Sequence, residues 1–139
     1  MYFLNPLRQV IILRAQKVTV YDPSLEDCGI TVTALSELFS RAGVKAVIRE
    51  FTDYEKFAYD FRDNHYDLAF VGITSVLDLE AARAVRKLDG KCPLFLLSRE
   101  KEYSLEGYRL NALDFIVKPV TVVRLREAVN RVGPPFLAV

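Results

Sequence analysis

The chain has 139 residues, 51% hydrophobic and 27% charged, and this balance excludes a disordered or low-complexity segment. Its 19 basic and 18 acidic residues give a formal net charge of +1, so no overall charge would attract nucleic acid or an anionic membrane. No apolar run approaches the roughly 20 residues that a membrane-crossing helix needs.

Five short apolar runs predict buried strands. In chain order they are residues 17–22, 45–51, 67–72, 93–98 and 114–118. The longer stretches between and after them carry apolar residues at helical spacing, and predict helices at 25–42, 53–64, 77–88, 104–110 and 121–132. In the first of these helices we expect Ile30, Leu35, Leu38 and Phe39 to form the buried stripe.

Strands that alternate with helices predict an α/β fold, because parallel neighbours need right-handed crossovers. We expect a doubly wound, parallel five-stranded sheet in three layers over residues 17–132. Residues 1–16 would form an N-terminal extension and residues 133–139 a C-terminal tail.

The two cysteines and the single histidine predict no cofactor and no metal centre. Cys28 and Cys92 lack the spacing of a zinc or redox motif, and His65 has no companion ligand. We interpret the cysteines as packing or surface residues of a cytoplasmic protein.

Four residues follow or end predicted strands. They are Asp22, Gly72, Ser98 and Lys118. In an open parallel sheet, sites form outside the carboxyl ends of the strands, so these residues should converge on one crevice.

Two segments carry a resemblance to a known family. Residues 111–119, Asn-Ala-Leu-Asp-Phe-Ile-Val-Lys-Pro, resemble the signature around the lysine of response-regulator receiver domains, and residues 79–83 resemble the start of that family's third helix. The resemblance covers about residues 17–132 and implies a flavodoxin-like (βα)5 fold. It also implies a role in two-component signal transduction or a phosphorelay.

The same resemblance shows what this chain lacks. A typical receiver accepts a phosphoryl group on an aspartate at the end of the third strand, beside magnesium held by an acidic pair after the first strand. Gly72 stands at the acceptor position and has no side chain. Tyr21-Asp22 leaves one carboxylate of the pair, so Asp22 alone would hold a metal at most weakly. The resemblance therefore implies a vestigial phosphorylation crevice in a pseudo-receiver.

Each residue of the crevice has two interpretations. Lys118 would contact a phosphate or, as we favour, pair with Asp22 across a desolvated crevice. Ser98 would contact a phosphoryl group or bond the backbone. Phe115 stands at the family's aromatic switch position, but we interpret its phenyl ring as part of the core. Gly72 would allow a positive φ or the close approach of another group.

Three residues after Gly72 are candidates for a displaced acceptor or an anion contact. Thr74 and Ser75 are poor acceptors, because a hydroxyl needs a general base and forms a less labile phosphoester. Asp78 is a carboxylate, but we interpret it as a helix cap or a solvated residue.

We expect the chain to act as a non-enzymatic binding module through phosphorylation-independent protein–protein interaction. Its partner would be a histidine kinase or an output protein. A homodimer would form through the face of residues 104–132, where Arg124, Arg126 and Arg131 lie, or through the apolar residues of segment 1–16. One alternative is an anion or small-molecule sensor built on the crevice. Another is a receiver phosphorylated at a displaced acceptor.

Overall fold

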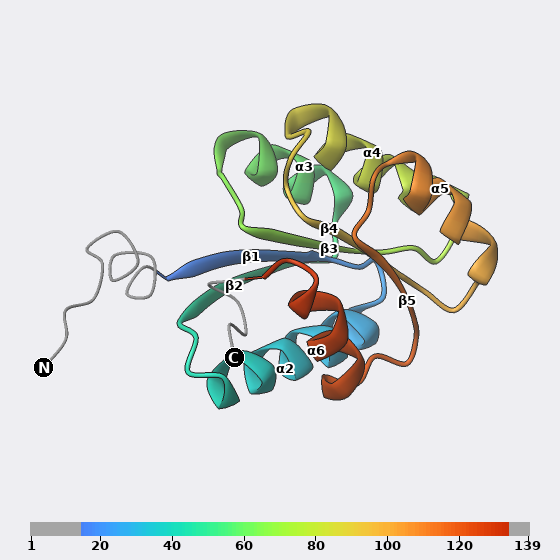
Figure 1. The fold of residues 1–139 in the computed structure, drawn as a ribbon. Helices are drawn as coiled ribbons and strands as arrows, with labels where there is room; N and C mark the ends of the chain where they lie inside the picture. The colour runs from blue at the N-terminus through green and yellow to red at the C-terminus, as the bar shows by residue number, and fades with distance from the viewer. Residues whose placement is uncertain (1–14, 134–139) are drawn as a thin grey trace, which may run out of the picture.

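Five parallel strands form one sheet in the order β2-β1-β3-β4-β5 (Figure 1). Their bounds are β1 Gln16–Tyr21, β2 Ala46–Phe51, β3 Leu68–Gly72, β4 Leu94–Ser98 and β5 Asp114–Val117. The computed structural model describes residues 15–133. The order reverses between β1 and β3, as in flavodoxin-like folds, and this confirms the predicted fold class.

Helices cover both faces of the sheet, so the molecule has three layers (Figure 1). One layer holds α2 (Leu25–Arg41) and α6 (Val122–Asn130); the other holds α3 (Tyr54–Asp63), α4 (Leu79–Leu88) and α5 (Ser104–Arg109). Two short 3-10 turns, η1 (Val76–Asp78) and η2 (Lys101–Tyr103), precede α4 and α5. The predicted helix 77–88 therefore divides into a turn and a helix.

Side-chain caps fix where three of the helices begin. The side chain of Ser24 accepts a hydrogen bond from the Asp27 amide, and Asp53 and Thr121 do the same at α3 and α6. Each cap satisfies an amide that the helix itself leaves without a partner.

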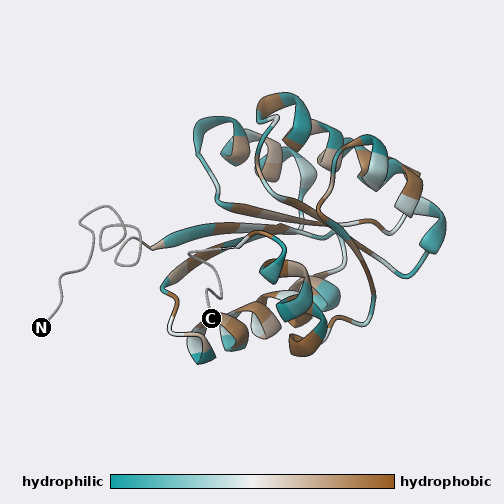
Figure 2. Ribbon diagram, viewed as in Figure 1, coloured by the Kyte–Doolittle hydropathy of each residue, from teal (hydrophilic) through white to brown (hydrophobic). Residues whose placement is uncertain are grey.

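Two apolar clusters pack on opposite faces of the sheet. One lies between the sheet and the α2–α6 layer, and includes the stacked rings of Phe70 and Phe95, whose centroids are 4.6 Å apart. The other lies under α3 and α4, and includes Phe57 and Phe61. The central strands therefore have apolar residues on both faces, while the outer sides of the helices are largely hydrophilic (Figure 2).

One expectation about packing was wrong in detail. Ile30 is 40% exposed, because the buried face of α2 runs instead through residues such as Asp27, Cys28 and Ala34. Both cysteines are buried and free of disulfides.

Parts of the predicted extensions lie outside the described residues. These are residues 1–14 and 134–139. Among the helices of residues 15–133, none has the length and apolar character that a membrane crossing demands.

Candidate functional site

The carboxyl ends of the central strands bring the predicted residues together. Asp22 follows β1, Gly72 ends β3, Ser98 ends β4 and Lys118 follows β5. All four are buried, and Lys118 is only 6% exposed although it carries a charge. Such burial requires a partner for the ammonium group.

The side chain of Asp22 lies directly against Gly72. A Cβ atom placed on Gly72 would lie 2.1 Å from Oδ2 of Asp22 and 2.3 Å from its Cγ. Real Cβ atoms do not approach other heavy atoms so closely, so any residue larger than glycine would have to displace Asp22. Of the two interpretations of Gly72, close approach is the one that the structure supports.

Lys118 neutralises the Asp22 carboxylate. Its Nζ lies 2.6 Å from Oδ2 of Asp22, and the two side chains are 2% and 0% exposed. The Ser24 amide donates to the other carboxylate oxygen at 2.9 Å. The predicted pairing of Asp22 with Lys118 is therefore present, in a place where an unpaired charge would be costly.

Two further charged residues, neither of them predicted from the sequence, join this pair. Asp27, in the first turn of α2, accepts a hydrogen bond from Lys118 Nζ at 3.0 Å. Arg99, just after β4, donates to the two oxygens of Asp27 at 2.6 and 3.2 Å. Asp22, Lys118, Asp27 and Arg99 form a continuous chain of alternating charge, which we name the ionic cluster.

The pKa of Asp27 is lowered to about 2, mainly by the hydrogen bond from Arg99. Burial of the carboxyl group opposes this change by raising the pKa, and the hydrogen bond from Lys118 lowers the pKa further. The signal that could have revealed Asp27 is its place one helical turn after the Ser24 cap. An acidic residue there is ordinarily explained by the helix dipole alone.

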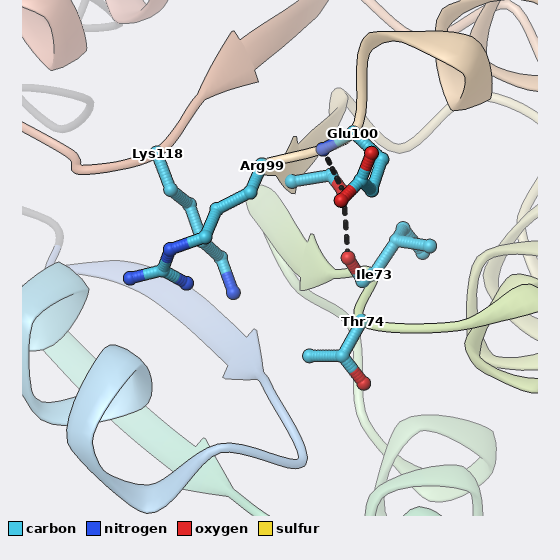
Figure 3. A pocket seen from close by; sticks show the side chains of 6 residues that line it. Ile73, Thr74, Arg99, Glu100 and Lys118 are labelled. Atoms are coloured by element: carbon cyan, nitrogen blue, oxygen red, sulfur yellow. Dashed lines mark hydrogen bonds between the residues drawn. The ribbon is translucent and has the colours of Figure 1, made fainter.

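Ser98 uses its hydroxyl within the backbone. Its Oγ donates to the carbonyl of Ile73 at 2.7 Å and accepts from the Glu100 amide at 3.1 Å, as the dashed lines in Figure 3 show. These contacts match the structural interpretation of Ser98, because they tie the end of β4 to the loop after β3.

A small pocket of about 120 Å³ lies beside Ser98. It is lined by Ile73, Thr74, Ser98, Arg99, Glu100 and Lys118. In Figure 3 the cationic ends of Arg99 and Lys118 lie on the opposite side of the view from Glu100 and Ile73. Both are held by carboxylates of the ionic cluster, so neither cation of this described lining is free of a protein partner.

The three candidate substitute residues bond to one another. Oδ2 of Asp78 accepts from the Thr74 amide at 2.7 Å, from the Thr74 hydroxyl at 2.6 Å and from the Ser75 amide at 3.0 Å. Asp78 is 9% exposed and makes no side-chain cap to α4. It therefore fastens the loop that precedes it, instead of capping the helix that follows.

Aromatic residues occupy the two other positions to which the resemblance to receiver domains draws attention. Tyr21 stands where a second carboxylate would be expected, stacks on Phe57 at 5.1 Å between ring centroids, and has a pKa raised to about 12, mainly by burial. Phe115 is half-buried and packs against the cluster under α3 and α4. Core packing therefore accounts for both rings.

The arrangement does not fit the magnesium ion of conventional receivers. That ion is held by carboxylate oxygens. In this crevice the carboxylates of Asp22 and Asp27 are each hydrogen-bonded to a cationic side chain. Gly72, which has no side chain, occupies the position where the acceptor carboxylate would be expected. Within residues 15–133, no group of three or more His, Cys, Asp or Glu side chains is placed to hold a metal.

Comparison with known sequences finds response regulators at low identity. The transcriptional regulatory protein LytR of Staphylococcus aureus is 27% identical over 71 residues, which are 50% of this chain and 29% of that protein. The sensory transduction protein LytR of Staphylococcus haemolyticus is 25% identical over 88 residues, which are 62% of this chain and 34% of that protein. The chain thus matches about a third of the length of these relatives. No family model matches it.

Solved structures of receiver domains share the fold. The chemotaxis response regulator CheY4 of Vibrio cholerae has a TM-score of 0.69 and 21% identity, over 86% of this chain and 99% of that one. The receiver domain of AraT from Geobacillus stearothermophilus has a TM-score of 0.69 and 23% identity, over 86% and 93% of the two chains. TrrA of Thermotoga maritima, solved with magnesium and beryllofluoride, has a TM-score of 0.65 and 23% identity, over 84% and 98%. The chain therefore has the CheY-like receiver fold, and the sequence matches support a response regulator.

Proposed function

We propose that this chain is a receiver-type signalling domain that acts by protein–protein contact, without phosphorylation of its crevice. The main support for this proposal is the position of Asp22. Its carboxylate fills the space beside Gly72 and is neutralised by Lys118. A fixed internal ion pair thus stands where an acceptor side chain would begin.

The chemistry of aspartyl phosphorylation explains why this arrangement is unsuitable. Transfer of a phosphoryl group needs a carboxylate nucleophile, a divalent metal and a cation that stabilises the transferred oxygens. In this crevice the nucleophile position is Gly72, and the charge of Lys118 is shared between Asp22 and Asp27. The proposed role is that of a binding module, with no covalent step.

The partner would be another signalling protein, either a histidine kinase or an output protein, and the surface of α5, β5 and α6 is the proposed contact. Large apolar side chains are exposed there, namely Leu105, Tyr108, Leu113, Val117 and Val123. By contrast, Arg124 on α6 and Arg131, the residue just after it, both bind Asp114 within the domain. Exposed apolar groups, more than the arginine row, would therefore supply the contact. A homodimer through this surface is one form of the proposal.

The input would be the partner itself or its abundance, since a ligand shifts an equilibrium only through different affinities for two states. Anion sensing at the pocket is less favoured, because Arg99 and Lys118 are already paired. Phosphorylation at Asp78 is less favoured too, because one of its oxygens accepts three hydrogen bonds.

Nuclear magnetic resonance provides the test. Amide spectra of the ¹⁵N-labelled chain would be recorded with magnesium alone, and then with magnesium and beryllofluoride. The proposal predicts no saturable shifts at Gly72, Ile73 or Ser98. Saturable shifts at these amides in the presence of beryllofluoride would mean that the crevice still accepts a phosphoryl mimic, and would contradict it.

A further inference from the structure

A small cavity lies between α2 and the segment that follows β5. It has a volume of about 10 Å³, enough for one water molecule, and is lined by Asp27, Ile30, Thr31, Lys118, Pro119 and Val120. Half of the lining comes from α2 and half from the segment after β5. The cavity therefore lies where the ionic cluster joins two parts of the fold.

Thr31 contributes a buried hydroxyl group to this part of the structure. The residue is 0% exposed, and within residues 15–133 its hydroxyl oxygen, Oγ1, makes no hydrogen bond to the protein. Buried polar groups in folded proteins nearly always have a partner, because leaving one unpaired is costly. The hydroxyl of Thr31 therefore requires a partner that is not a protein atom of the described residues.

The ammonium group of Lys118 belongs to the same lining. Within the described residues Nζ donates to Oδ2 of Asp22 at 2.6 Å and to Oδ2 of Asp27 at 3.0 Å, and an ammonium group can donate once more. The side chain is only 2% exposed, so bulk solvent has little access to this further proton. One small ligand in the cavity would satisfy both Lys118 and Thr31.

The charges of the lining favour a neutral ligand. Lys118 would repel a metal ion, and the carboxylate of Asp27 would repel an anion. Ile30, Pro119 and Val120 supply apolar walls, which offer no further side-chain hydrogen bonds. The size of the cavity and the balance of its charges together indicate a water molecule.

A route for water exists on the outer side of the cavity. Ile30 and Val120 also line an open hollow of about 540 Å³ between α2 and the start of α6. Ile30 is 40% exposed, so the wall that the two spaces share reaches the surface of the domain. Water can therefore exchange with solvent without unfolding of the layer.

We propose that this cavity binds one ordered water molecule, which accepts a hydrogen bond from Lys118 Nζ and donates one to Thr31 Oγ1. Buried waters typically make about three hydrogen bonds, and the second proton of this water is available to the carboxylate of Asp27. The water extends the ionic cluster to Thr31 and joins α2 to the segment after β5. The site is independent of the proposed function.

A high-resolution crystal structure of the chain tests the site directly. The expected result is one isolated peak of electron density within about 3.2 Å of both Thr31 Oγ1 and Lys118 Nζ. Thr31→Val should lose this peak, whereas Thr31→Ser, which keeps the hydroxyl group, should retain it. The absence of a peak in the wild type, or an unchanged peak in Thr31→Val, would overturn the proposal. Anomalous scattering at this position in crystals grown with bromide would assign the site to an anion and equally overturn it.

Thermal unfolding gives a second readout, because its sign differs between a hydrated and an unpaired hydroxyl group. If Thr31 binds the water, Thr31→Val removes a hydrogen bond and should lower the Tm by roughly 3–6 °C. If the hydroxyl is unpaired, the same change removes a buried polar group without a partner and should raise the Tm. Thr33→Val, at an exposed position of the same helix, is the matched control and should change the Tm by less than about 2 °C. A Tm of Thr31→Val equal to or above that of the wild type would contradict the bound water.

Discussion

The carboxylate of Asp22 lies where a side chain on Gly72 would begin, with Oδ2 only 2.1 Å from the position of a Cβ atom. The glycine and the carboxylate are therefore one structural feature, in which each explains the other. Lys118 completes it by supplying the opposite charge at 2.6 Å.

Gly72→Ala should destabilise the domain by about 1–3 kcal/mol, the usual cost of forcing an extra carbon into a packed interior. In the background of Asp22→Gly, which removes the colliding atoms, the same change should cost less. Urea unfolding of the four proteins measures both values. Gly90→Ala is the matched control, because no heavy atom lies within 4 Å of its added Cβ. Equal costs of Gly72→Ala in the two backgrounds would show that Asp22 does not restrict this position.

Lys118→Met should destabilise the domain by about 3–5 kcal/mol, because it leaves the buried carboxylates of Asp22 and Asp27 without their shared cation. Adding Asp22→Asn should recover part of that loss. The exposed Lys101→Met serves as the control and should change stability by less than about 0.5 kcal/mol. A loss for Lys118→Met no larger than for the control would contradict the ionic cluster as described.

Asp27 should make stability fall in acid. Its pKa in the folded state is about 2, below the ordinary 3.8, so its contribution is full above pH 4 and disappears as the pH falls towards 2. Arg99→Gln removes the largest cause of the low pKa and should raise the pKa of Asp27. Carboxyl chemical shifts of Asp27 across this pH range measure the change. Arg109→Gln, which removes an exposed pair with Glu106, should leave the Asp27 titration where it was.

Tyr108→Ser should weaken partner binding without loss of stability. The side chain is 82% exposed on α5, so its removal leaves no cavity. Light scattering over a range of concentrations measures the homodimer form of the proposal, and unfolding in urea measures stability. Tyr59→Ser, on α3 and 67% exposed, is the matched control. One contrary result is that the wild type self-associates while Tyr108→Ser keeps the same mass distribution as the wild type and as Tyr59→Ser. That result would show that the dimer uses another surface.

The sequence predicted the fold well because hydrophobic periodicity and strand burial are local signals. The runs that became β3 and β4 are apolar on both faces, as central parallel strands require. The prediction for Ile30 was wrong because its spacing suits a helix face, whereas the buried side of α2 is set by its contact with the sheet and α6.

The site was predictable only in part. Asp22, Gly72, Ser98 and Lys118 were found because each follows or ends a strand, and topology alone brings strand ends together. Asp27 and Arg99 lie 72 positions apart in the sequence, and their pairing depends on the orientation of α2 relative to the β4 loop. That the space beside Gly72 is filled by Asp22 is a matter of side-chain packing, which no periodicity reveals.

Intact mass after incubation with acetyl phosphate and magnesium tests the central claim most directly. The chain would be compared with a receiver that retains its acceptor aspartate, which checks the phosphodonor. We predict that the wild-type mass stays unchanged while the comparison protein gains a phosphoryl group. A gain of one phosphoryl group by the wild type, at Asp78 or any other residue of the crevice, would contradict a domain that signals without phosphorylation.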